Sequence, residues 1–374
     1  MLLYATLSMA FLGTTLGTLI YTKNPDERTP SDPDTFPLLS GEFHRGVNHA
    51  HIHRRGHGYG SSSSAHELDS LRTIGVTWIA IMPYGYQNGV HGDRVFGFPG
   101  NEGRSEFFSR YDPTMTDDDL LAEIANAHRR GLKVMVKPHI WSSDFWEGDE
   151  WHGTIDQSTG DGHDRWWKTY RQFAIHYAIV AREGSADMYC VGTELVRMST
   201  HYPEEWIALI EDIRKIYNGP LTYAAHWEDE FTLITFWDRL DYIGVNAYFP
   251  LDARSDATVG ELERAWRPHR LVLADLSSHY HRPVLFLEAG YRAVHGTHQK
   301  PWQYKGKPFS PEAQARAFEA LFRAFHHAAW WKGVYFWKTW TDPSMKYEKD
   351  DGSGFSFRGL PAELVLRKWY GRER

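Results

Sequence analysis

The chain has 374 residues, of which 42% are hydrophobic and 15% aromatic, so it is long enough to bury a large core in one or two domains. Its net charge is −7 and it contains no basic run interleaved with aromatic residues, which argues against a surface for binding nucleic acid. The single cysteine, Cys190, excludes an internal disulfide framework and a cysteine-rich zinc site.

The N-terminal stretch is unlike the rest of the chain. Residues 2–21 carry no charge and are followed by a polar segment rich in Pro and Asp. This segment lacks the basic start and the clear A-x-A cleavage site of a standard signal peptide, and it lacks the cysteine of a lipoprotein. From the uncharged segment we still interpret residues 1–36 as a cleaved export signal or a membrane anchor, followed by a linker. The remaining alternative is that the segment has neither function. Export would place the rest of the chain outside the cytoplasm, as a secreted, periplasmic or membrane-anchored protein.

From residue 41 onward, strand-like apolar segments alternate with amphipathic helical segments. Such alternation is typical of a parallel α/β architecture and not of a β-sandwich. The eight predicted strands lie in residues 41–51, 76–86, 132–141, 187–195, 221–227, 240–250, 282–291 and 333–341. Helices are predicted in residues 65–75, 116–131, 164–184, 203–219 and 310–331.

Eight strand–helix units of this kind fit a closed (β/α)8 TIM barrel, and we predict that residues 37–374 form such a barrel as a single domain. A doubly wound open sheet is the alternative, but no G-x-G-x-x-G motif follows the first strand. The two long loops at residues 87–113 and 142–163 are expected to form the walls of a cleft.

Glu194 and Glu288 are the candidate catalytic residues. Glu194 ends the fourth predicted strand and Glu288 ends the seventh. In a barrel of this kind the reactive side chains lie at the C-terminal ends of the strands, where a ligand has access. One such carboxylate alone is often an ordinary ion-pair partner. Two of them in positions four and seven predict the pair that glycoside hydrolysis requires, one protonated and one ionised.

The motifs VGTEL, DYIGVNAYFP and FLEAGY make this chain resemble clan A of the glycoside hydrolases. Within the clan they resemble glycoside hydrolase family 113 most, a family known for endo-β-1,4-mannanase activity. The resemblance implies a retaining hydrolase of β-linked polysaccharide, above all β-1,4-mannan, with Glu194 as acid/base and Glu288 as nucleophile. Many clan members carry Asn directly before the acid/base, whereas this chain has Thr193, which leaves open how the sugar 2-hydroxyl is held.

Physical chemistry supports these roles. Retention requires the two carboxyl groups to lie about 5–5.5 Å apart. Apolar neighbours and the negative charge of Glu288 are expected to keep Glu194 protonated. By the resemblance, Tyr248, two positions beyond Asn246, donates a hydrogen bond to Glu288 and keeps it ionised.

Aromatic residues at the strand ends are candidate platforms for sugar rings. Trp337 on strand eight matches the clan's usual floor for the sugar next to the scissile bond. His139 and Trp141 are two residues apart on strand three and therefore face the same way. Lys137 has two alternatives, a hydrogen bond to a sugar hydroxyl or an ion pair with a barrel carboxylate. The predicted substrate-binding set is Asn48, Lys137, His139, Trp141, Thr193, His226, Trp227, Asn246, Tyr248 and Trp337.

The histidine-rich segment after strand one supports a different chemistry. His49 and His51 form an H-x-H pair of the kind that opens metal-dependent amidohydrolase barrels, which hold zinc through imidazoles. That class also requires a His after strand six, where this chain has Asn246 and Tyr248. We therefore predict neither a metal nor another cofactor, and a polysaccharide or oligosaccharide as the binding partner. A carbohydrate-binding barrel without catalysis is a second alternative. Loss of either glutamate would favour this alternative, but both Glu194 and Glu288 are present.

Overall fold

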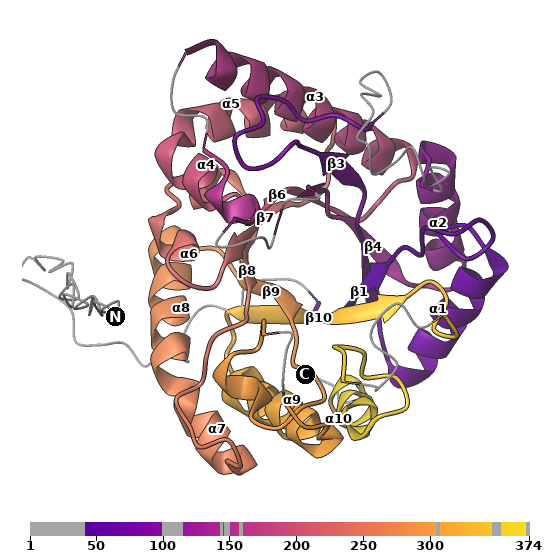
Figure 1. The fold of residues 1–374 in the computed structure, drawn as a ribbon, viewed down its shortest axis with the longest axis vertical. Coiled ribbons are helices and arrows are strands. Elements are labelled where there is room, and N and C mark those ends of the chain that lie inside the picture. Colours follow the sequence, from indigo (N-terminus) through magenta and orange to yellow (C-terminus); the bar gives the residue numbers. More distant parts are fainter. Residues whose placement is uncertain are drawn as a thin grey trace, which may run out of the picture. The chain divides into compact units, whose positions relative to one another are not determined.

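The computed structural model describes residues 42–98, 115–142, 145, 150–156, 160–303, 307–345 and 353–371. Eight parallel strands close into a barrel in the spatial order β1, β10, β9, β8, β7, β6, β4, β2 (Figure 1). They are β1 (His44–Ala50), β2 (Trp78–Ile81), β4 (Lys133–Val136), β6 (Met188–Thr193), β7 (Leu221–His226), β8 (Ile243–Asn246), β9 (Val284–Ala289) and β10 (Trp331–Trp340). The predicted (β/α)8 fold is confirmed. The predicted export segment and linker, residues 1–36, lie outside the described residues.

Helices surround the ring of strands (Figure 1). They are α1 (Ser62–Ile74), α2 (Asp117–Arg129), α3 (Gly160–Glu183), α4 (Val196–His201), α5 (Pro203–Arg214), α6 (Glu230–Leu233), α7 (Val259–Ala265), α8 (Arg267–Tyr280), α9 (Pro311–Phe325) and α10 (Pro361–Tyr370). Their ends follow local sequence signals. Thr116 and Asp119 form a capping box at the start of α2, and Gly75 ends α1 with a φ of 94°, which glycine adopts without strain.

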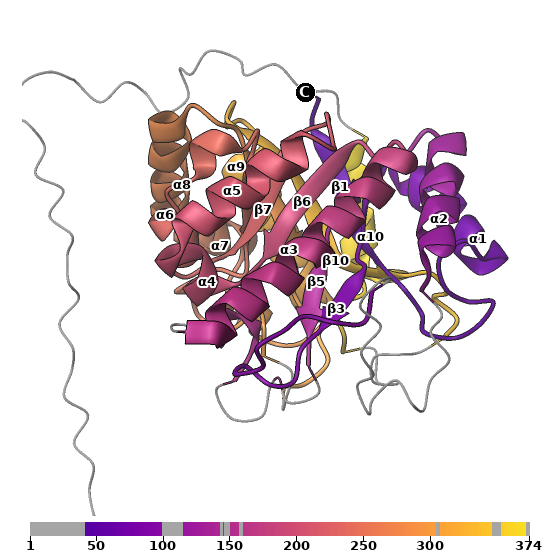
Figure 2. The same cartoon turned by 90° about the horizontal axis from the view of Figure 1, so that it is seen from above.

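Two predicted strands are each divided by a proline. The segment 76–86 forms β2 in the barrel and then β3 (Tyr84–Tyr86), while the segment 132–141 forms β4 and then β5 (His139–Trp141). Pro83 and Pro138 lack the N–H that would continue the barrel ladder, so the chain leaves the ring at both positions. Strands β3 and β5 pair with each other beyond the C-terminal ends of β2 and β4 (Figure 2).

The barrel interior is a packed core rather than a channel. Its buried side chains are Trp78, Ala80, Met135, Met188, Cys190, Ala224, Leu285, Leu287 and Tyr335. Burial raises the pKa of the Cys190 thiol to about 11, so this cysteine is an inert core residue. A second and larger cluster fills the space between the strands and the helices. Only the C-terminal rim of the ring is therefore left for a ligand.

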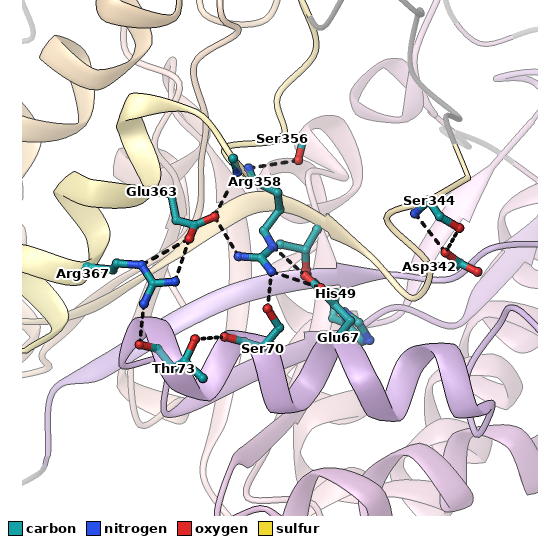
Figure 3. Close-up of polar contacts among 12 residues, drawn as sticks. His49, Glu67, Ser70, Thr73, Asp342, Ser344, Ser356, Arg358, Glu363 and Arg367 are labelled. Atoms are coloured by element: carbon teal, nitrogen blue, oxygen red, sulfur yellow. Dashed lines mark hydrogen bonds and ion pairs between the residues drawn. The ribbon is translucent and has the colours of Figure 1, made fainter.

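Arg358 joins the last helical unit to the first (Figure 3). Its guanidinium forms ion pairs with Glu67 on α1 at 3.0 Å and with Glu363 on α10 at 2.8 Å, and it donates a hydrogen bond to Ser70. Burial raises the pKa of Glu67, and the charge of Arg358 opposes that rise. Because α1 follows the first barrel strand and α10 follows the last, this contact helps to hold the ring closed.

Replacing Arg358 tests its contribution to stability. We expect Arg358→Met to lower the free energy of unfolding by about 3–5 kcal/mol, because the Glu67 carboxylate is left buried without its cation. Urea unfolding measures the change. The matched control is Arg367→Met, which removes a more exposed arginine from Glu363 and should cost about 0–1 kcal/mol. Equal losses in the two variants would contradict this account.

Candidate active site

Glu194 is the first residue after β6, and its backbone is held in an unusual conformation. Its φ is +50°, in the left-handed region that non-glycine residues rarely adopt. Two hydrogen bonds fix this turn: the Glu194 N–H donates to the Ala224 carbonyl at 2.8 Å, and the Leu195 N–H donates to the Tyr223 hydroxyl at 2.8 Å. Backbone strain of this kind is concentrated at functional sites, where the surrounding structure has to maintain it.

The Glu194 carboxylate is bonded to His152, from the short helix η2 (His152–Thr154) in the loop after β5. The distance from His152 Nε2 to Glu194 Oε2 is 2.8 Å. Burial raises the pKa of Glu194. The hydrogen bond from His152, the electrostatic interactions with His226 and His152 and the nearby Asn246 amide outweigh burial and lower this pKa to about 2. Polar neighbours surround the carboxylate where apolar ones were expected, and they favour its ionised form, so the expected protonation of Glu194 stays a prediction.

Glu288 lies on β9 and accepts two hydrogen bonds. Lys137, which follows β4, donates from Nζ to Oε1 at 2.6 Å, and Tyr248, two residues after β8, donates from its hydroxyl to Oε2 at 2.8 Å. Burial raises the pKa of Glu288, the charge of Lys137 lowers it, and the negative charge of Glu194 raises it further. The two predicted carboxylates thus interact electrostatically in one site at the C-terminal ends of β6 and β9.

Three predicted substrate-binding residues have no exposed surface: Asn48, Lys137 and Asn246. The fully buried Lys137 forms the ion pair with Glu288, which was one of its two predicted alternatives. The Asn48 amide donates to the carbonyls of Leu287 and Tyr335, so it joins β1 to β9 and β10 below the site. Any effect of these three residues on a sugar has to act through their neighbours.

Thr193 also makes its contact with the protein itself. Its hydroxyl donates to the carbonyl of Pro138 at 3.2 Å, which ties the end of β6 to the start of β5.

Two of the predicted aromatic residues, His139 and Trp337, are in ring contact on the Glu288 side. The His139 imidazole is stacked on Trp337 with 6.3 Å between ring centres, and the Lys137 ammonium lies 5.5 Å from the centre of the Trp337 ring. His139 Nε2 lies 3.9 Å from Glu288 Oε1. Burial and the charge of Lys137 hold the pKa of His139 well below its usual range, so its ring is neutral. Trp141 is half-buried at the end of β5.

The other predicted aromatic residues lie on the Glu194 side. The His226 ring is 4.8 Å from the ring of Trp151 and 5.1 Å from that of Trp227. Burial lowers the pKa of His226, while the charge of Glu194 raises it. The predicted site residues therefore form two groups, one beside each carboxylate.

The histidines of the predicted metal alternative are used in the structure of the protein. His49 is fully buried, and its Nε2 lies 2.9 Å from the Ser64 hydroxyl and 3.2 Å from Glu123. His51 accepts a hydrogen bond from the Tyr59 N–H at 2.9 Å. Within the described ranges, no three His, Cys, Asp or Glu side chains converge as metal ligands would. The arrangement gives the H-x-H pair a packing role.

Sequence reasoning missed two polar residues of the site. His152 lies in a long loop without a periodic pattern, so nothing local marks it. Glu230, at the start of α6, accepts hydrogen bonds from the Ser199 hydroxyl at 2.6 Å, the Tyr223 hydroxyl at 2.5 Å and the His226 N–H at 2.6 Å. Burial raises the pKa of Glu230 to about 7. Through Tyr223, this carboxyl supports the turn at Glu194.

No helix in the described part of the chain has the length and apolarity needed to cross a bilayer.

A (β/α)8 barrel with coupled carboxylates after its fourth strand and on its seventh has the architecture of a barrel glycoside hydrolase. Comparison with known families agrees: a sequence profile of Glycoside Hydrolase Family 113 matches residues 47–359, and the chain belongs to this family. It is thus a glycoside hydrolase. A sequence comparison with curated proteins finds no match.

Solved structures share the fold. A GH113 β-mannanase, AaManA from Alicyclobacillus acidocaldarius, in complex with ManMIm, is similar with a TM-score of 0.75 at 24% identity, covering 90% of this chain and 99% of that one. A GH113 β-1,4-mannanase complex has a TM-score of 0.72 at 22% identity, covering 89% and 100%. A β-glucuronidase from Faecalibacterium prausnitzii has a TM-score of 0.55 at 14% identity, covering 88% of this chain and 49% of that one.

Proposed function

We propose that this chain is a retaining endo-β-mannanase that cleaves β-1,4-mannan by double displacement, with Glu194 as acid/base and Glu288 as nucleophile. One observation carries the proposal: two coupled carboxylates at the barrel rim have different donors. Glu288 is held by Lys137 and Tyr248, which fix both of its oxygens, whereas Glu194 is held through one oxygen by His152. A nucleophile has to be fixed and ionised, and an acid/base has to exchange a proton.

The two steps balance with these residues alone. The Glu288 carboxylate attacks the anomeric carbon while Glu194 delivers a proton to the departing glycosidic oxygen, which leaves a glycosyl ester on Glu288. Glu194, now ionised, takes a proton from a water molecule as this water attacks the anomeric carbon, which breaks the bond from that carbon to the Glu288 oxygen and gives net retention. The donors around Glu194 favour its ionised form in the free site, and the first step requires its protonated form. A bound sugar chain excludes water, and this burial favours the uncharged carboxylic acid.

The mannan assignment rests on family membership and on the likeness to two structures of GH113 β-mannanases. Trp337 provides a flat ring beside Glu288, and we propose that it is the floor under the sugar that Glu288 attacks. The half-buried His139 and Trp141 then line the same side of that sugar. Chemistry by two carboxylates requires no metal or other cofactor.

Removing either carboxylate tests the catalytic assignment. We expect Glu288→Ala to lower kcat on mannan by about 10⁴-fold or more, because no other side chain can form the ester. Glu194→Ala should lower it by about 10²–10⁴-fold, the usual contribution of a general acid. Release of reducing ends measures both, and circular dichroism checks the fold.

Azide distinguishes the two roles. It should increase the turnover of Glu288→Ala and yield a glycosyl azide of inverted configuration, since the small anion fits where the carboxylate was. With an activated aryl glycoside, Glu194→Ala should instead yield a glycosyl azide of retained configuration. Near-normal hydrolysis by either alanine variant would remove the assignment.

The bond from His152 to Glu194 predicts a change in pH dependence. The hydrogen bond and the electrostatic interaction with His152 lower the pKa of Glu194, so His152→Gln should raise this pKa and move the pH profile of kcat/KM toward higher pH. We expect a displacement of about 1–3 pH units for the limb that reports Glu194, the usual effect of a nearby opposite charge. His163→Gln, on α3, is the matched control and should leave the profile in place. An unchanged profile in His152→Gln would show that this bond does not set the protonation of the acid.

We also propose that the uncharged residues 2–21 take the enzyme out of the cytoplasm, which suits a polymeric substrate that cannot enter a cell. Deleting residues 2–21 should retain the protein in the cytoplasmic fraction of an expression host, whereas the full chain should be found in the exported or membrane fraction. N-terminal sequencing of the exported protein distinguishes a cleaved signal from an anchor. Full-length protein confined to the cytoplasm would overturn the proposal.

A further inference from the structure

A second row of aromatic rings leads away from the catalytic pair on the Glu194 side. The Trp151 ring lies 5.0 Å from that of His152 and 4.8 Å from that of His226. His226 is 5.1 Å from Trp227, and Trp227 is stacked on Trp302 with 4.9 Å between ring centres and 19° between planes. The rings come from the end of β7 and from the loops after β5, β7 and β9, so segments far apart in the sequence build one surface.

The row becomes more exposed with distance from Glu194. Trp151, His226 and Trp227 are half-buried, and Trp302 at the far end is 38% exposed. An indole at this exposure loses part of the apolar contact that a buried tryptophan would make. Stacked, accessible rings in a carbohydrate-active enzyme suit the apolar faces of sugar rings.

The contacts at the inner end of the row indicate which part of the substrate chain it would bind. His152 connects the row to Glu194, and in the proposed mechanism Glu194 protonates the oxygen of the leaving group. The row of Trp337 and His139 adjoins Glu288, which attacks the anomeric carbon of the other product. The rings that begin at Trp151 therefore lie on the side of the leaving group, which is the reducing-end part of the substrate chain.

We propose that Trp151, His226, Trp227 and Trp302 form a leaving-group platform that binds reducing-end sugar units of a β-linked oligosaccharide, with Trp302 as its outermost contact. This inference rests on the proposed function. Binding at this platform makes efficient cleavage depend on sugar units on the reducing-end side of the scissile bond. Such dependence favours cleavage within a chain. A substrate whose leaving group is a small phenol does not reach Trp302.

The test compares two substrates that share a glycone: a linear β-1,4-mannooligosaccharide and an aryl β-glycoside of the same mannooligosaccharide glycone. In Trp302→Ala, the ratio of kcat/KM for the oligosaccharide to kcat/KM for the aryl glycoside should fall about 3- to 10-fold, as expected for one lost stacking contact. Phe309→Ala is the matched control, because Phe309 is an exposed aromatic residue after the same strand, 51% accessible, and outside the row. Its ratio should equal that of the wild type.

A second measurement separates binding from catalysis. In the inactive Glu288→Ala background, the dissociation constant of the oligosaccharide, followed by tryptophan fluorescence or calorimetry, should rise when Trp302 is also replaced. An unchanged substrate ratio in Trp302→Ala, or an equal fall in Trp302→Ala and Phe309→Ala, overturns the platform while the proposed hydrolase stands. A wild-type enzyme that releases no reducing ends from any β-linked mannan overturns the proposed function itself, and the platform with it.

Discussion

Two carboxylates share one buried site at the mouth of the barrel, and their mutual repulsion is the constraint to which the surrounding side chains respond. A closed ring of parallel strands brings the C-terminal ends of all its strands to one rim, so Glu194 and Glu288 meet there although 94 positions separate them in the sequence. Like charges in a buried site cannot both remain ionised without partners. The chain supplies Lys137 and Tyr248 to Glu288, and His152 to Glu194.

These donors divide the site into two functional halves. Glu288 has both oxygens fixed, one by Lys137 after β4 and one by Tyr248 after β8, which suits a nucleophile aimed at one carbon. Glu194 sits on a strained turn and is bonded by a histidine from a loop, which suits a group that takes and gives a proton. Aromatic rings adjoin each half of the site. The difference between the donors of Glu288 and those of Glu194 therefore supports both the catalytic assignment and the proposed direction of the substrate chain.

The fold could be predicted from the sequence because strand and helix periodicities repeat at each unit of the barrel. The positions of Glu194 and Glu288 could be predicted for the same reason, since both end an apolar run. The division of two strands at Pro83 and Pro138 was visible in principle, but the apolar pattern continues across both prolines. The hydrogen bond from His152 to Glu194 could not be predicted, because the loop of His152 has no periodic pattern and meets β6 only in the folded chain. Glu230 was missed because a polar sequence around a short helix gives no sign that its carboxyl is buried.

The central claim is that Glu288 forms a covalent bond to the sugar, and trapping that ester tests it most directly. A 2-deoxy-2-fluoro mannosyl fluoride slows both steps and should accumulate an ester on the nucleophile. Mass spectrometry of the digested protein should then find one added fluoroglycosyl group, located on Glu288, and none in Glu288→Ala. A label on another residue, or an inverted product anomer with no label at all, would contradict the account.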